Sequence, residues 1–196
     1  MFTMRNTFFM KNVFRMVNIS TLLTVGATVV LIGAYLLFPS DGLLAAAITA
    51  GTICYHSNAR GLIGVVISRH CRDRLDPHSF WFRQHRFEPG LYRLLKVKRW
   101  KDKMPTYDPQ AFSLKDRDLN DIILNSCNAE LVHEVCMAAG FLPLAMVPFV
   151  GAFWVFFITS TLSAMADGVF VLIQRYNRPR LLRLAEKRKG GRHGTI

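Results

Sequence analysis

The chain has 196 residues, 51% hydrophobic and 19% charged, and its 25 lysines and arginines against 13 acidic residues give a net charge of +12. The hydrophobic share and the 15 phenylalanines exclude an intrinsically disordered basic protein. The pattern also argues against a free nucleic-acid-binding protein, because lysine and arginine are absent from two long stretches, 16–59 and 118–174. The length predicts a single domain.

The N-terminal residues 1–18 interleave basic and apolar side chains, which predicts an interfacial amphipathic helix. Residues 19–38 then form an uninterrupted apolar run, and about 20 such residues cross a hydrocarbon core of about 30 Å. The run ends at the turn-forming residues 39–42. A cleavable signal peptide is the alternative, since basic residues come first and 44–47 resemble a cleavage site. The run is longer than a typical signal core, which favours a transmembrane helix.

The next apolar segment, 43–68, carries a polar cluster at its middle: Tyr55, His56, Asn58 and Arg60. Polar groups at membrane depth face protein or water. Either one helix buries the cluster against its neighbours, or the span is shorter and the segment after Asn58 lies at the interface. The cluster is a candidate functional site, and a snorkelling Arg60 is the structural alternative.

Residues 69–130 are predicted to form a cytoplasmic loop rich in both aromatic and basic side chains. The aromatic residues are Phe80, Trp81, Phe82, Phe87, Tyr92 and Trp100, among Arg83, Arg86, Arg93, Lys96, Lys98, Arg99, Lys101 and Lys103. Such a mixture suits the headgroup boundary of a membrane. The alternative is a wall that binds phosphate-bearing or sugar-bearing amphiphiles. The aromatic residues follow no known RNA-binding pattern, so we expect no nucleic-acid partner.

The region from Val135 to Gln174 has no basic residue and one acid, Asp167. At helical rise it is about 60 Å long, enough for two crossings. We therefore predict helices at 131–149 and 152–174, a turn near 148–151 on the outer side, and a basic tail at 175–196. The fold class is an all-α integral membrane protein with about four transmembrane helices.

The distribution of charge predicts the orientation. Residues 1–18 carry +3, the segment 69–130 carries +4 and the tail carries +7, whereas the turn at 39–42 carries −1. By the positive-inside rule, both termini and the long loop are cytoplasmic. We expect the protein to lie in a bacterial inner membrane.

Candidate chemistry begins with Glu130 and His133, which are three residues apart and therefore share a helix face. A carboxylate beside an imidazole suits general-base catalysis, although a solvated helix end is the commoner explanation. Asp167, Gln174 and Arg178 lie within about 20° of one helical stripe. Asp167 is either a half-buried acid paired with a basic neighbour or a satisfied structural aspartate. The four cysteines lack metal-ligand spacing, so we expect free thiols and no metal.

Four segments resemble the glycosyl-4,4'-diaponeurosporenoate acyltransferase family of carotenoid biosynthesis. They are Phe87-Glu88-Pro89-Gly90 with Tyr92, Arg99-Trp100-Lys101, Ala129-Glu130-Leu131-Val132-His133, and Gln174-Arg175-Tyr176-Asn177-Arg178-Pro179-Arg180-Leu181. The resemblance extends over roughly Phe80 to Arg183, and the last segment is the most specific. It implies a small membrane enzyme that moves a fatty acyl group onto a hydroxyl of a glycolipid.

This resemblance implies roles for named residues. His133, oriented by Glu130, would take the proton from the acceptor hydroxyl. Arg175, Asn177 or Arg178 would stabilise the oxyanion or bind donor phosphates, and Asp167 and Gln174 would also contact substrate. Glu88 and Tyr92 would hold the sugar, with Trp100 and Lys101 at headgroup level. The donor would be acyl-CoA or acyl carrier protein as a substrate, with no bound cofactor, and no GxSxG elbow points to a serine nucleophile.

Two other classes stay open. One is a different lipid-modifying membrane enzyme, such as a methyl or alkyl transferase or a reductase. The other is a non-enzymatic adaptor that binds anionic lipid or a partner protein, whose binding would follow salt concentration. The expected partners are membrane lipids, and the pattern does not determine the oligomeric state.

Overall fold

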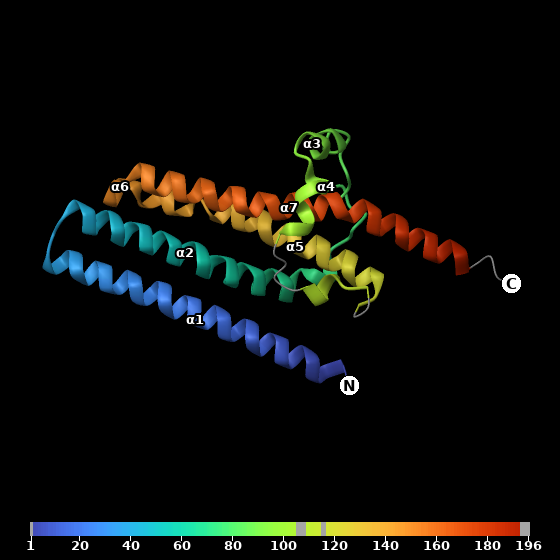
Figure 1. The fold of residues 1–196 in the computed structure, drawn as a ribbon, viewed down its shortest axis with the longest axis horizontal. Helices are drawn as coiled ribbons and strands as arrows, with labels where there is room; N and C mark the ends of the chain where they lie inside the picture. Colours follow the sequence, from blue (N-terminus) through green and yellow to red (C-terminus); the bar gives the residue numbers. More distant parts are fainter. Residues whose placement is uncertain (1, 105–108, 115–116, 193–196) are drawn as a thin grey trace. The chain divides into compact units, whose positions relative to one another are not determined.

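The computed structural model describes residues 2–104, 109–114 and 117–192, with side chains for 19–104, 111–114 and 117–188. Throughout these residues the regular structure is helical and no strand occurs (Figure 1), which confirms the all-α prediction. The α-helices are α1 (Phe2–Leu37), α2 (Asp41–His70), α3 (Glu88–Leu94), α4 (Val97–Trp100), α5 (Leu119–Ala139), α6 (Val147–Val150) and α7 (Phe153–Arg192). Short 3-10 turns lie at Arg72–Arg74, Lys101–Lys103, Pro109–Phe112 and Leu142–Met146.

Three segments of the described chain are long and apolar enough to cross a membrane: Ile19–Leu37, Leu119–Val150 and Phe153–Arg188. The first lies in α1 and the third in α7, while the second contains α5, a 3-10 turn and α6. The predicted segment 43–68 forms the continuous helix α2, but α2 is not among the three. Its central polar residues lower its mean hydropathy, so its apolar character alone does not predict a span.

Helix α5 begins at Leu119, inside the segment that we had assigned to the loop. A buried stripe at helical spacing explains this start: Leu119, Ile122, Ile123, Ser126, Cys127 and Glu130. The amides and acids between these positions hide the stripe in the sequence. The helix then ends at Ala139, earlier than the predicted 149, because Gly140 and Pro143 follow.

The predicted break near residues 148–151 is present. Gly151 and Ala152 have positive φ angles of 72° and 53°. A right-handed helix requires negative φ angles, so the helical path is interrupted at these two residues. Helix α7 then runs to Arg192 and continues past the predicted end at 174, with Pro179 inside it. At the other end of the chain, α1 begins at Phe2 without a break before the apolar run. The side chains of residues 1–18 lie outside the described residues, and so does the interfacial face predicted for them.

The chain divides into two compact units. The first comprises Met1–Gly64 and Cys136–Met165, and the second comprises Val65–Val135 and Ala166–Ile196. In the first unit, α1 and α2 form an antiparallel pair (Figure 1). Leu22, Leu36 and Phe149 expose 72%, 71% and 80% of their surface. Large exposed apolar side chains on long helices are typical of a surface that faces lipid.

The polar cluster of α2 is partly buried within the first unit. The Tyr55 hydroxyl donates to the Ala139 carbonyl at 2.7 Å. Arg60 donates to the hydroxyl and the carbonyl oxygen of Ser163 at 2.9 and 3.1 Å, and Ser163 Oγ lies 3.2 Å from His56 Nδ1. Of the two arrangements predicted for this segment, the structure shows the single helix that packs its polar residues against neighbouring helices.

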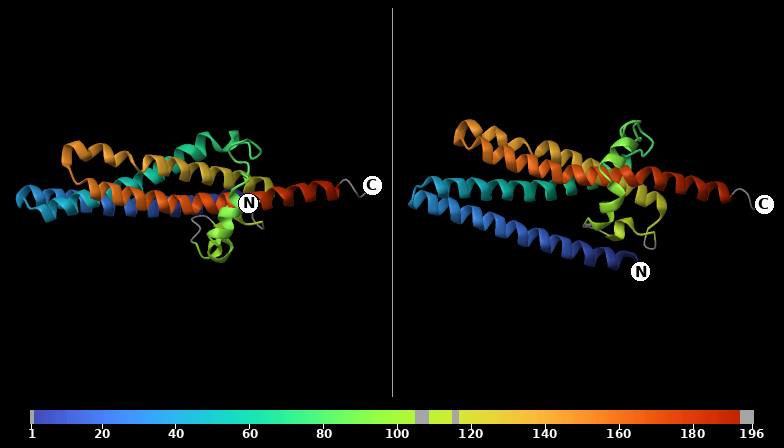
Figure 2. Two further views of the ribbon diagram at one scale, coloured as in Figure 1. Left: turned by 90° about the horizontal axis from the view of Figure 1, so that it is seen from above. Right: turned by 45° about the horizontal axis from the view of Figure 1, so that its top comes forward.

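In the second unit, α5 and α7 run antiparallel, and α3 and α4 lie beside α7 (Figure 2). Its buried apolar side chains come from α3, α4, α5 and the segment before α3: Phe82, Tyr92, Val97, Ile122, Ile123 and Cys127. The four cysteines of the chain are free thiols. This unit contains every candidate residue named from the motifs, and the site is built within it.

Candidate active site

Two buried carboxylates and two guanidinium groups meet in the second unit, and we call Glu88, Glu130, Arg175 and Arg178 the ion-pair cluster. Glu88 is the first residue of α3, Glu130 lies on α5, and the two arginines lie one turn apart on α7. Glu88, Glu130 and Arg178 are each at most 3% exposed. The formal charges of the four groups cancel, which is the condition for burying them.

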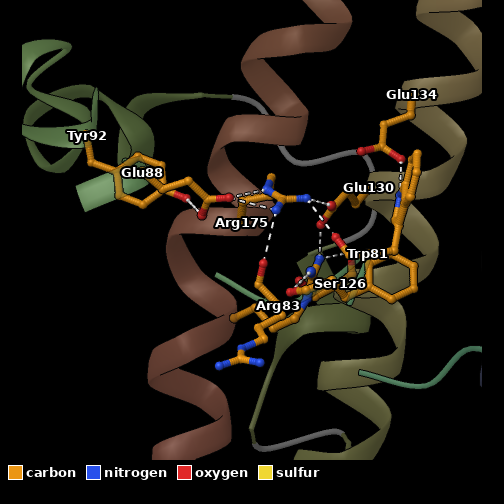
Figure 3. Close-up of polar contacts among 10 residues, drawn as sticks. Trp81, Arg83, Glu88, Tyr92, Ser126, Glu130, Glu134 and Arg175 are labelled. Carbon is orange, nitrogen blue, oxygen red and sulfur yellow. Dashed lines mark hydrogen bonds and ion pairs between the residues drawn. The ribbon is translucent and has the colours of Figure 1, made fainter. Parts of the chain in front are cut away.

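Arg175 occupies the centre of the cluster, between the two carboxylates (Figure 3). Its Nε and Nη2 donate to Glu88 Oε1 at 2.9 and 2.6 Å, and its Nη1 donates to Glu130 Oε1 at 2.6 Å. Arg178 donates to the other oxygen of Glu130. Both oxygens of Glu130 therefore accept charge-assisted hydrogen bonds, and its carboxylate is not available as the partner of His133.

The same two arginines hold the segment before α3. Arg175 donates to the carbonyl oxygens of Trp81 and Arg83 at 3.1 and 3.2 Å, and Arg178 donates to the carbonyl of Phe82 at 3.1 Å. Three consecutive carbonyls therefore receive hydrogen bonds from guanidinium groups, and the one at Phe82 is buried, where a carbonyl needs such a donor. The Arg178 guanidinium also lies over the Phe82 ring, 4.9 Å from its centroid. The cluster thus fixes residues 81–83 against α7.

Tyr92 completes the cluster on the side of α3. Its hydroxyl donates to Glu88 Oε2 at 2.6 Å, and its ring meets the Tyr176 ring edge to face with centroids 5.2 Å apart. Burial, followed by the hydrogen bond to the Glu88 carboxylate, raises the pKa of Tyr92 above its ordinary value. The hydroxyl therefore remains a proton donor to Glu88 throughout the physiological pH range.

His133 lies one turn along α5 from Glu130, but it pairs across to α7. Its Nδ1 is 2.9 Å from Asp167 Oδ1, and its ring stacks on Phe170 with centroids 4.8 Å apart. Asp167 is 2% exposed, whereas the His133 side chain keeps 26% of its surface open. The expectation that Glu130 orients His133 is corrected by this geometry. Asp167 was predicted to be either a half-buried acid paired with a basic neighbour or a satisfied structural aspartate; it is paired with His133, but it is buried rather than half-buried.

The remaining predicted residues are more peripheral. Trp100 donates its indole N–H to the Leu95 carbonyl at 2.8 Å. Lys101 pairs with Asp102 at 2.6 Å and lies over the Tyr176 ring. Gln174 and Asn177 are half-buried on α7, beside the two arginines. The structure therefore gathers Glu88, Tyr92, Glu130, Arg175 and Arg178 together and sets His133 with Asp167 apart from them.

Three residues of the site were not singled out from the sequence. Phe170 stacks on His133, Ser126 offers its carbonyl to Arg178 at 3.3 Å, and Glu134 accepts the Trp81 indole N–H at 2.8 Å. Phe170 lies three residues after Asp167, on the same helix face, so its spacing carried a usable signal. A backbone carbonyl such as that of Ser126 leaves no such signal.

The arrangement suits two tasks. A half-exposed imidazole held by a buried carboxylate can accept a proton at its second ring nitrogen. A neutral ion-pair cluster can hold a loop in place beside two long helices, but its charged groups are already paired with one another.

A comparison with family models matches residues 77–187 to the family described as glycosyl-4,4'-diaponeurosporenoate acyltransferase. Searches among curated proteins and among solved structures gave no match. The matched range contains the ion-pair cluster and the His133–Asp167 pair, and it confirms the resemblance found in the motifs. Because this range is more than half of the 196 residues, the chain belongs to the glycosyl-4,4'-diaponeurosporenoate acyltransferase family, a family of acyltransferases of carotenoid biosynthesis.

Proposed function

We propose that this protein transfers a fatty acyl group from a thioester donor to a sugar hydroxyl of a glycolipid, with His133 as the general base. The hydrogen bond between His133 and Asp167 is the observation that carries this proposal. With Nδ1 protonated and donating to Asp167, Nε2 holds the lone pair that accepts a proton. The open part of the His133 side chain gives an acceptor hydroxyl access to it.

The reaction balances with these groups. The hydroxyl oxygen attacks the thioester carbonyl carbon while Nε2 of His133 takes the hydroxyl proton. The tetrahedral intermediate then collapses, the carbon–sulfur bond breaks, and the imidazolium returns the proton to the leaving thiolate. Asp167 stabilises the imidazolium between the two steps, and the Phe170 ring restrains the orientation of the imidazole. The products are an ester and a free thiol.

The ion-pair cluster acts in this proposal as a positioning element. Since Glu88, Tyr92, Arg175 and Arg178 bond to one another or to Glu130, their function is to hold residues 81–88 beside α7. This revises the direct substrate contacts that we expected for them. Gln174 and Asn177, half-buried beside the arginines, have the amide donors that could contact the oxyanion or the sugar.

The membrane setting follows from the charge pattern. The basic segments predict that the second unit, with Trp100 and Lys101, lies at the cytoplasmic face. Acyl-CoA and acyl carrier protein are available on that side, and we propose one of them as the donor substrate. The acceptor named by the family is a glycosylated carotenoid acid, which would enter from the lipid phase.

Mass spectrometry of lipid extracts tests this function in cells that supply the glycosyl carotenoid acid. The wild type should convert it to a product heavier by one fatty acyl group. His133→Asn should abolish the product, because asparagine can still donate to Asp167 but offers no basic nitrogen. His70→Ala is the matched control, since His70 is an exposed histidine at the end of α2. Unchanged product with His133→Asn would remove His133 from the mechanism.

A further inference from the structure

A cleft of about 300 Å³ lies in the second unit between the segment before α3 and the C-terminal part of α7. Its walls include Pro77, His78, Phe82, Arg83, Gln84 and Leu182. A second cavity of about 260 Å³ shares Pro77, His78 and Leu182 with it and continues toward Ile123 and Leu124 of α5. The two cavities therefore adjoin each other: we call the cleft that Arg83 lines the polar part, and the other cavity is also lined by Asn120 and Glu186.

Arg83 supplies the charge of the polar part. Its carbonyl oxygen is held by Arg175, but its guanidinium points away from the ion-pair cluster (Figure 3). No described residue forms a hydrogen bond or an ion pair with this guanidinium. Arg175 and Arg178 also donate to the carbonyls of Trp81 and Phe82, the two residues before Arg83. The backbone that carries the Arg83 side chain is therefore fixed.

The other arginines of the site are paired with carboxylates, and of these Arg178 also lines the cleft. Arg175 is shared between Glu88 and Glu130, and Arg178 is paired with Glu130. Two carboxylates thus neutralise these two cations, and Arg83 is the cationic group of the cleft wall without a carboxylate. His78 and Gln84 are exposed beside it and add further hydrogen-bond donors.

We propose that this cleft binds the phosphate group of the acyl-thioester donor through Arg83, an inference that rests on the proposed function. A guanidinium matches phosphate oxygens in a bidentate geometry, and both acyl-CoA and acyl carrier protein carry a phosphate at the end of a pantetheine arm. Donor phosphate is thus bound by Arg83 rather than by Arg175 or Arg178.

The position along the helices agrees with the length of such an arm. Arg175 holds the Arg83 carbonyl, and from Arg175 to Asp167 the rise along α7 is about 12 Å. A pantetheine chain has the length of about four extended residues, about 14 Å between phosphate and sulfur. A phosphate bound at Arg83 therefore allows the thioester to approach the His133–Asp167 pair.

Equilibrium binding of unacylated coenzyme A to the full chain in lipid nanodiscs tests the proposal without any turnover. Arg83→Gln should weaken coenzyme A binding about tenfold or more, with partial recovery in Arg83→Lys. Pantetheine, which lacks the phosphate, should bind Arg83→Gln and the wild type equally. Arg86→Gln is the matched control, because Arg86 is a nearby exposed arginine outside the cleft walls, and it should bind coenzyme A as the wild type does.

Three results would overturn the assignment: unchanged coenzyme A binding by Arg83→Gln, equal losses in Arg83→Gln and Arg86→Gln, or a loss confined to enrichment of phosphatidylglycerol around the protein. The last result would assign the cleft to a lipid headgroup. The proposed function is tested separately. If the wild type binds coenzyme A through Arg83 but transfers no acyl group, the proposed function is wrong and the assignment of the cleft stands. If the wild type transfers an acyl group but coenzyme A binding does not depend on Arg83, only the assignment of the cleft is wrong.

Discussion

His133 pairs with Asp167 across two helices, with 2.9 Å between Nδ1 and Oδ1, although Glu130 lies only three residues away on the same helix. The reason is competition for Glu130. Two guanidinium groups on α7 donate to both of its oxygens, and charge-assisted bonds of that kind are stronger than a bond to a neutral imidazole. The His133 imidazole therefore pairs with Asp167, the carboxylate that does not pair with an arginine of the cluster.

The His133–Asp167 pair predicts a large effect of Asp167→Asn on turnover. Replacing the carboxylate removes the group that stabilises the imidazolium and fixes its tautomer, so kcat should fall about 100-fold or more. KM for the acyl donor should change little, because Asp167 is buried and does not face the substrate. Steady-state kinetics of the purified enzyme measure both constants. A rise in KM with unchanged kcat would contradict a role in the chemical step.

Glu130→Gln is expected to act on folding stability, since it leaves the buried Arg178 without its carboxylate. Breaking one side of a buried ion pair costs about 3–5 kcal/mol. The double variant Glu130→Gln with Arg178→Gln should lose less stability than the single variant, because no unpaired charge remains. Thermal unfolding in detergent compares them, with Glu134→Gln on the same helix as the control. Equal losses in the single and double variants would argue against the ion pair as the source.

The Tyr92–Glu88 hydrogen bond predicts a difference in stability at alkaline pH. The folded-state pKa of Tyr92 is raised above the unfolded value of 10.0, so the folded state retains a proton that the unfolded state loses. This contribution is complete below pH 10.0 and decreases as the pH rises toward the folded-state pKa. The unfolding temperature of the wild type should therefore fall more steeply above that pH than that of Tyr92→Phe. Parallel curves would contradict the shift.

Tyr92→Phe should also destabilise the protein at neutral pH by about 1.5–3 kcal/mol, since a buried carboxylate loses a hydrogen bond. The ring itself and its contact with Tyr176 are kept. Chemical denaturation of the two proteins at pH 7 measures the difference. Equal midpoints would mean that water replaces the hydroxyl at Glu88.

Ser163→Ala distinguishes a structural polar network from a second catalytic group. Ser163 contacts Arg60 and His56 in the first unit, and its hydroxyl accepts from the Arg60 guanidinium. Removing the hydroxyl should lower the level of protein in the membrane and its thermal stability, while the kcat of the inserted protein stays within about twofold. Quantitative immunoblotting with activity assays separates the two quantities. Normal membrane levels with lost turnover would reassign catalysis to Ser163 and His56.

The sequence by itself determined the helical class, the long apolar helices and the composition of the site. The gaps in lysine and arginine predicted about four spans, and three segments of the described chain are long and apolar enough to cross a membrane, because hydropathy depends on composition alone. The motifs likewise identified the family and named Glu88, Glu130, His133, Arg175 and Arg178, since each lies in one of the segments that resemble the family. The start of α5 was missed, because its buried stripe is mixed with amides and acids.

Only the tertiary structure decided which of these groups pair. Spacing along one helix placed Glu130 beside His133, and spacing along the other placed Asp167 in line with Arg178. The pairs depend on how α5 and α7 align. In this alignment Glu130 pairs with the two arginines and Asp167 pairs with His133. The same alignment leaves Arg83 as the cation of the cleft. A periodic pattern in the sequence shows which residues share a face of one helix. Whether two side chains pair depends on the distance between their atoms on two different helices.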